Sequence, residues 1–222
     1  MKKLALMLLV GSAWACGNSS EAPAPKAREA RIAPIAAVKA PALPAKPAVP
    51  GLEQDLRDAD PKVRRAAVRE AARDGGDPQL FLAASRDPDR EVAIVATEAL
   101  AKAHARGEVP ASELIARATD RSVDERVRVS AINGLGLVAS PEAARTLADL
   151  VHRGDMLEKR SAAILLVHQD PDVAVPALID ALADADEVVR ANALEALRGK
   201  ARGRDFGVDA GAWRSWWQAR SR

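Results

Sequence analysis

The side chains best able to do chemistry are few in this chain and lie far apart. The histidines are His104, His152 and His168, and the single cysteine is Cys16. A zinc site needs three or four such ligands at short spacings, and a nucleophile needs a base within hydrogen-bond reach. Neither pattern occurs, and the sequence also lacks a Gly-x-Ser-x-Gly elbow. We therefore expect no catalytic, metal or cofactor site and identify no small-molecule substrate.

The composition argues against two classes of partner. Residues 51–222 contain 26 basic and 29 acidic side chains, a net charge of −3, so no broad basic surface for nucleic acid is expected. Aromatic residues make up 3% of the chain and tyrosine is absent, which argues against an aromatic-lined ligand pocket.

Residues 1–15 have the three parts of a secretory signal. Two lysines are followed by an apolar run too short to span a bilayer, and Ala13 and Ala15 are the small residues that a signal peptidase reads. We expect cleavage between Ala15 and Cys16 and export of the rest. An ordinary N-terminal core helix is the weaker alternative, because a proline-rich segment rather than a domain follows.

The cleavage region, Ala13-Trp14-Ala15-Cys16 followed by Gly17, resembles a bacterial lipoprotein signal. The resemblance implies lipidation of Cys16, although Ala13 stands where the family usually has leucine and Trp14 is bulky. Gly17 is not the aspartate of inner-membrane retention, so the resemblance implies an outer-membrane lipoprotein facing the periplasm. The alternative is a soluble periplasmic or secreted protein with a free thiol, a liability in an oxidising compartment.

Residues 16–50 read as a disordered tether. Proline recurs every few residues there and removes backbone donors, which blocks both helix and sheet. At about 3.1 Å per residue, an extended segment of this length reaches on the order of 100 Å. Such a spacer would hold a domain away from the membrane to which Cys16 is anchored.

From residue 51 onward, one helical pattern occurs five times. An anchor position is followed four residues later by alanine and eight residues later by an apolar residue, which places all three on one helical face. The anchors are Val63, Val92, Val127, Lys159 and Val189. Their intervals are 29, 35, 32 and 30 residues, so short amphipathic helices stack in series. The last copy is the most regular, with Val189, Ala193, Ala196 and Leu197 expected in the core and Asp184 or Asp186 as its cap.

A second helix precedes each copy. The expected ranges are 52–57, 78–85, 111–119, 141–151 and 171–183. Three of them begin with a capping residue followed by proline, which suits the first helical position. Pro176 is also expected in a first turn, so the last of these helices should begin a little after Pro171. Gly134 and Gly136 fall in a repeat helix, where they indicate close packing or a bend.

The period, the pairing and the run from Val175 to Leu197 (VPALIDALADADEVVRANALEAL) resemble HEAT repeats of the bacterial type known from phycobilin lyases. The resemblance covers about residues 52–200. It implies an all-α fold, a right-handed α-solenoid of about five helix pairs.

The resemblance also implies a ladder of aspartate and arginine side chains between repeats. Its aspartates would be Asp58, Asp87 and Asp184, and its arginines would be Arg64, Arg128, Arg160 and Arg190. Ala93, Ser122 and Gly154 depart from the pattern, so gaps are expected there. A ligand site built from these arginines is the weaker alternative.

Residues 201–222 contain a basic loop and a short helix expected to start near Asp209. Trp213, Trp216 and Trp217 share one helical face, and the tail resembles the Trp-rich end that closes bacterial arrays of this kind. We expect a cap over the open end of the solenoid. The alternative is an anion or nucleic-acid platform made with Arg198, Lys200, Arg202, Arg204 and Arg214.

Together these features predict a non-enzymatic scaffold of the bacterial cell envelope that binds a protein partner on the surface lined by the second helices. The candidate contact residues are Arg65, Arg69, Glu98, Lys102, Asn133, Asn192 and Glu195. The alternatives are an enzyme or enzyme subunit related to the HEAT-like lyases, and a structural protein without a specific partner. The HEAT-like hydroxylases bind iron through His-Glu pairs, and no His-Glu dipeptide occurs in this sequence.

Overall fold

The structure is a computed structural model that describes residues 51–220. The predicted signal peptide, the lipidation site Cys16 and the tether of residues 16–50 lie outside the described residues. Every regular element within residues 51–220 is helical, which confirms the all-α class. In this range no helix has the length and apolar character needed to cross a membrane.

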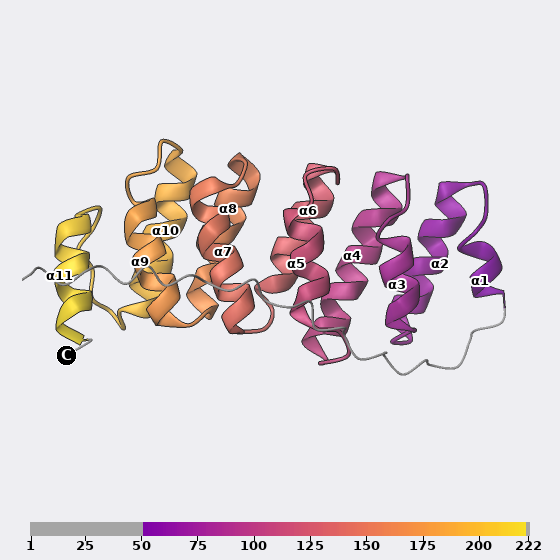
Figure 1. Ribbon diagram of the computed structural model, residues 1–222, viewed down its shortest axis with the longest axis horizontal. Coiled ribbons are helices and arrows are strands. Elements are labelled where there is room, and N and C mark those ends of the chain that lie inside the picture. The colour runs from indigo at the N-terminus through magenta and orange to yellow at the C-terminus, as the bar shows by residue number, and fades with distance from the viewer. Residues whose placement is uncertain (1–50, 221–222) are drawn as a thin grey trace, which may run out of the picture. The chain divides into compact units, whose positions relative to one another are not determined.

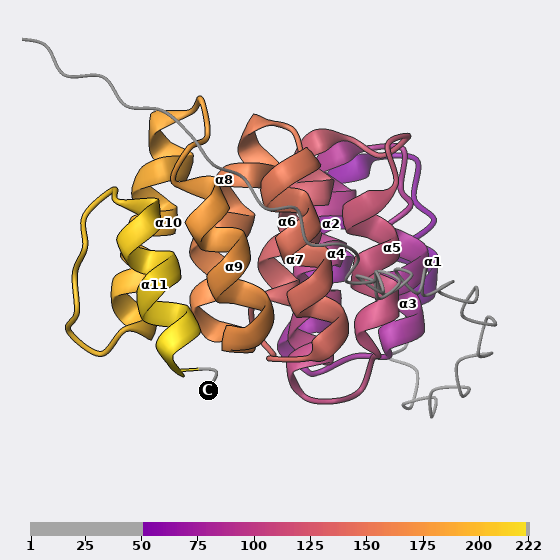
Figure 2. The same ribbon diagram turned by 60° about the vertical axis from the view of Figure 1, so that its left-hand side comes forward.

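The helices form two layers in chain order (Figure 1). The layer of first helices contains α1 (Leu52–Asp55), α3 (Pro78–Ala84), α5 (Ala111–Thr119), α7 (Pro141–Arg153) and α9 (Pro171–Ala181). The layer of second helices contains α2 (Pro61–Arg73), α4 (Arg90–Ala105), α6 (Glu125–Leu135), α8 (Met156–Leu165) and α10 (Glu187–Lys200). Each second helix packs against the next second helix, and Figure 2 shows the same stacking from the side. The described chain is therefore an α-solenoid of five helix pairs.

Side-chain caps explain where the second helices begin. Asp60, Asp124 and Asp186 each accept a hydrogen bond from a backbone N–H in the first turn of α2, α6 and α10, respectively. Asp184, the other cap considered for α10, instead accepts from the backbone N–H of Asp186 at 2.9 Å. These carboxylates also suit the positive end of the helix dipole.

The predicted first helices agree with the structure to within two residues, with one correction at Pro176. The helix α9 begins directly at Pro171, capped by Asp170, and carries Pro176 in its interior. A proline there removes the hydrogen bond to the carbonyl four residues earlier. Pro176 is exposed, so water can satisfy that carbonyl, and the helix continues through it.

Small residues bring the second helices close together. Val189, Ala193, Ala196 and Leu197 of α10 are all buried, as predicted. Gly134 shows how tight the packing is, because a Cβ atom added there would lie 2.6 Å from the Cβ of Ala101 on α4. That distance is too short for two carbon atoms, so Gly134 is needed for close packing rather than for a phosphate loop.

The fourth copy lies one residue earlier than predicted. Its N-cap is Asp155, three residues before Glu158, just as Asp186 stands three residues before Val189. Three residues at the anchor, alanine and apolar spacings are fully buried: Glu158, Ala162 and Leu166. Lys159, the predicted anchor, is only half-buried. The anchor is therefore a glutamate, and the anchor intervals become 29, 35, 31 and 31 residues.

The Trp-rich tail closes the end of the solenoid. The helix α11 (Ala210–Arg220) packs against α9, and Asp209 accepts a hydrogen bond from the backbone N–H of Ala212 near its start. Trp213 is fully buried, Trp216 is 8% exposed, and the two rings meet edge to face with centroids 5.5 Å apart. These indole rings belong to the core, so they are not available as the stacking platform of the alternative interpretation.

Candidate partner-binding surface

The predicted ladder joins neighbouring second helices. Arg64 on α2 donates from Nε and Nη2 to the two carboxylate oxygens of Asp87, at 2.7 and 2.8 Å. Lys159 holds the equivalent place on α8, and its Nζ donates to Asp184 at 2.8 Å. Ala93 holds the equivalent place on α4 and has no charged side chain, which leaves the predicted gap in the ladder between α4 and α6. The engaged residues therefore serve the packing of repeats rather than a ligand.

Two details of the ladder prediction were wrong because the fourth copy was misaligned. Arg160 donates from Nε and Nη2 to Asp186, at 3.0 and 2.6 Å, and Asp186 was not among the predicted aspartates of the ladder. The gap expected at Gly154 is filled, because Arg128 reaches the neighbouring Asp155 from Nη2 at 2.7 Å.

Glu158 is the buried centre of this contact between α6 and α8. Its carboxylate accepts from Arg128 Nε at 2.6 Å, from Arg121 Nη1 at 2.8 Å and from the backbone N–H of Asp155 at 2.9 Å. Burial opposes ionisation of Glu158, but these donors together lower its pKa below the ordinary value. A charged side chain thus replaces the apolar anchor, and only its paired arginines make that position tolerable.

The pKa of Asp186 is lowered to about 2, chiefly because Arg160 donates to its carboxylate and then because the backbone N–H of Val189 does so. A pKa below the unfolded value of 3.8 means that Asp186 stabilises the fold above that pH and loses its contribution as the pH falls toward 2.

We predict that Arg160→Met raises the pKa of Asp186 toward 3.8, measured by NMR titration of the carboxyl carbon. Arg153→Met should leave it unchanged; an unmoved pKa in Arg160→Met would contradict the pairing.

The face of the second helices opposite the core is the surface available to a partner. Positions one before, six after and ten after each anchor lie within about 40° of one another around a helix, away from the buried anchor and alanine columns. We call this set the outward face. Its members on α2 and α4 are Lys62, Arg69, Arg73, Glu91, Glu98 and Lys102. Its members on and just after α6, α8 and α10 are Arg126, Asn133, Leu137, Leu157, Ile164, His168, Val188, Glu195 and Gly199.

A depression of about 360 Å³ lies on this face between α2 and α4. Its charged residues are Arg69, Arg73, Glu98 and Lys102. Its apolar residues are Ala72, Val95 and Ala99. Within residues 51–220, no acidic side chain forms an ion pair with any of its three cations. The depression therefore combines exposed positive charge with small apolar surface.

The structure brings three of the seven predicted contact residues together: Arg69, Glu98 and Lys102. Arg65 is half-buried on α2, and Asn133 is exposed on α6. Asn192 donates from Nδ2 to the carbonyl of Arg160 at 2.9 Å, so its amide links α10 to α8. Glu195 is exposed on α10, within 3.7 Å of Arg198.

The sequence analysis missed Arg73, the third cation of the depression. Arg73 follows Arg69 by four residues, which places the two on the same face of α2. That spacing was visible in the sequence and could have identified it.

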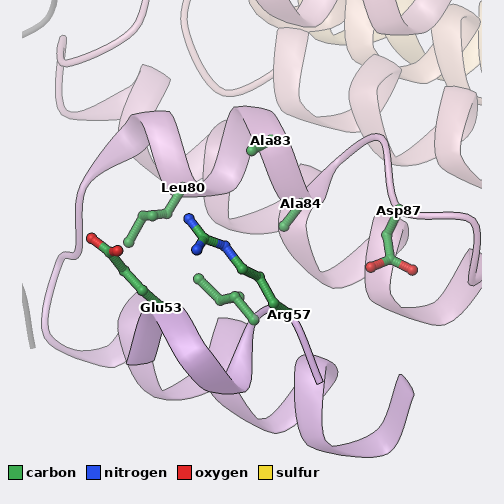
Figure 3. A pocket seen from close by; sticks show the side chains of 7 residues that line it. Glu53, Arg57, Leu80, Ala83, Ala84 and Asp87 are labelled. Atoms are coloured by element: carbon green, nitrogen blue, oxygen red, sulfur yellow. The ribbon is translucent and has the colours of Figure 1, made fainter. Parts of the chain in front are cut away.

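A second pocket, of about 310 Å³, lies between α1 and α3 (Figure 3). Its apolar residues are Leu56, Leu80, Ala83 and Ala84, and Figure 3 shows the Arg57 side chain reaching toward Leu80. Asp87 also lines it but is already held by Arg64. The charged residues of the pocket are Glu53, Arg57 and Asp87. Across residues 51–220, no group of three or more His, Cys, Asp or Glu side chains is placed to hold a metal ion.

Comparison with known proteins supports the repeat assignment. Residues 111–198, which span α5 to α10, match the family model for HEAT repeats. No curated protein sequence matched the chain. Among solved structures, human deoxyhypusine hydroxylase in complex with glycerol is 25% identical, with 74% of this chain and 70% of that chain covered and a TM-score of 0.37. A TM-score of 0.37 is too low to support an inference about activity. The family match and the two layers of paired helices agree: residues 111–198 resemble HEAT repeats and lie within an all-α solenoid.

Proposed function

We propose that this chain is a non-enzymatic scaffold that binds a protein partner on the outward face of its second helices. The observation that carries the proposal is the depression between α2 and α4, where Arg69, Arg73 and Lys102 have no acidic partner within the described residues. Stacked helical repeats present extended surfaces of this kind for binding. The ladder supports the proposal too, because it joins α2 to α4, α6 to α8 and α8 to α10.

The alternative is an enzyme or enzyme subunit related to the HEAT-like lyases. The lining of the depression favours binding over catalysis, because cations beside small apolar residues suit ion pairing and packing.

In-cell photocrosslinking tests the scaffold proposal. A photoreactive residue replaces Asn133 on the outward face of the full chain, and a matched variant carries it at Arg145, on α7 in the opposite layer. We expect one protein to be captured from position 133 and not from position 145. Equal capture at both positions, or none at 133, would contradict the proposal.

We further propose that the chain is exported to the cell envelope as a lipoprotein anchored through Cys16, at the outer membrane and facing the periplasm. The support is the sequence pattern from Ala13 to Cys16 together with the proline-rich segment that follows. Mass spectrometry of the mature N-terminus tests it. A diacylglyceryl or acyl mass on Cys16 is expected, and an unmodified Cys16 at the N-terminus would instead indicate a soluble periplasmic or secreted protein.

A further inference from the structure

The outward face is cationic on α2 and apolar on α8. On α2 its three members are Lys62, Arg69 and Arg73, all positively charged. On and just after α8 its members are Leu157, Ile164 and His168, of which the first two are 37% and 46% exposed. Both ends use the same repeat positions, so the change lies along a single surface.

The apolar end extends over more than one helix. Leu157 and Ile164 stand seven residues apart, two turns of α8, and therefore share a face. Val188 occupies on α10 the position that Leu157 occupies on α8, and it is 43% exposed. Leu137, just after α6, is 58% exposed. Large apolar side chains gathered on one exposed face indicate a binding surface more strongly than single exposed residues do.

The cationic end selects for negative charge. Arg69, Arg73 and Lys102 gather around one depression that contains a single acidic residue, Glu98. Unpaired like charges concentrated in a depression attract an oppositely charged segment and raise its rate of association.

We propose that the outward face binds one segment of a partner protein that is acidic at one end and apolar at the other. This inference rests on the proposed function and adds the chemistry of the partner. The acidic end lies over the depression between α2 and α4, and the apolar end lies over Leu157, Ile164 and Val188. Packed helices stand about 8–10 Å apart, so three steps from α2 to α8 span about 25–30 Å. A helix of about 18 residues or an extended segment of about 8 covers that length.

The segment that precedes the solenoid in this chain does not have this chemistry. Residues 17–50 carry five basic and two acidic side chains, so their net charge has the same sign as the α2 end. Charge complementarity therefore indicates a segment from another protein.

A random library of peptides about 18 residues long, displayed on phage, tests the inference against the full chain. We expect enriched peptides to contain an acidic cluster and a separate apolar cluster. In fluorescence anisotropy at low salt, the double variant Arg69→Glu/Arg73→Glu should weaken binding of an enriched peptide by about tenfold or more. Ile164→Asp should weaken it several-fold.

Matched variants distinguish loss of the surface from general damage. Arg145→Glu makes one such charge reversal on α7, and Val208→Asp makes the same apolar-to-acid change at a residue that is 70% exposed before α11. Both should bind the peptide like the unsubstituted chain. Enriched peptides without an acidic cluster, no enrichment, or affinity unchanged in Arg69→Glu/Arg73→Glu would overturn the inference.

A membrane surface is the competing occupant, and vesicles of anionic phospholipid provide that comparison. Vesicle binding that is lost in both the charge variant and Ile164→Asp, with no peptide enriched, would overturn the inference in favour of lipid. Capture of a protein from position 133, with no acidic peptide selected, would leave the scaffold proposal standing and refute only this chemistry.

Discussion

Replacing Glu158 with alanine is expected to lower the free energy of unfolding by about 3–5 kcal/mol. The substitution removes the carboxylate that receives Arg128, whose side chain is 7% exposed, and so leaves a nearly buried positive charge without its main partner. Glu158 itself is fully buried between α6 and α8, so water cannot take its place without opening the contact between these repeats. Urea unfolding followed by circular dichroism measures the change.

The matched control is Glu142→Ala, which removes an exposed carboxylate on α7 and should change stability by less than about 0.5 kcal/mol. A double variant, Arg128→Met with Glu158→Val, removes both buried charges and restores an apolar anchor. It should be more stable than Glu158→Ala, because Glu158→Ala leaves the buried Arg128 charge without its partner, whereas the double variant contains neither buried charge. A double variant at least as unstable as Glu158→Ala would contradict this view of the α6–α8 contact.

Replacing Trp213 with alanine should lower the free energy of unfolding by about 3–5 kcal/mol, with the loss concentrated at the C-terminal end. Trp213 is fully buried, contacts Phe206 edge to face with centroids 4.9 Å apart, and donates from Nε1 to the carbonyl of Gly207 at 2.8 Å. The substitution creates a cavity and loosens the cap on α9. Urea unfolding together with amide hydrogen exchange locates the loss.

Faster exchange is expected in α9, α10 and α11, while α2 and α4 remain protected. Ser215→Ala, an exposed substitution on the same helix, should leave both measurements nearly unchanged. If Trp213→Ala destabilised the chain by less than about 1 kcal/mol, α11 would not act as a cap.

Much of the fold could be predicted because the same physical constraint recurs in each repeat. An alanine four residues after each anchor lets neighbouring helices approach, and its period in the sequence predicts the helix pairs. Proline after Asp77 and after Ser140 marked two helix starts, and side-chain caps confirm both. The tryptophans at core spacing in the tail likewise predicted the cap.

The fourth repeat could not be aligned correctly because its anchor is charged. Hydrophobic periodicity gives no signal for a buried glutamate, and Ala162 and Ala163 offered two registers that looked equally good. Only the three-dimensional placement of Arg121 and Arg128 makes Glu158 acceptable in the core. Pro176 was misplaced for a related reason, since whether a helix can continue through proline depends on how exposed the freed carbonyl is.

The candidate surface was predicted only in part. The structure gathers three of the predicted contact residues, Arg69, Glu98 and Lys102, in one depression, and their contact with a partner stays a prediction. The apolar residues Leu157 and Ile164 were missed, because their outward direction depends on the corrected register of α8. Asn192 has a structural hydrogen bond that no sequence pattern indicates.

The central claim is that a protein partner binds the outward face through its cationic end. The most direct test compares crosslinking from position 133 in the otherwise unsubstituted chain with crosslinking in Arg69→Glu/Arg73→Glu, both in cells at matched expression. We expect the charge variant to lose most of the captured partner and Arg145→Glu to retain it. Equal capture in all three chains would contradict it.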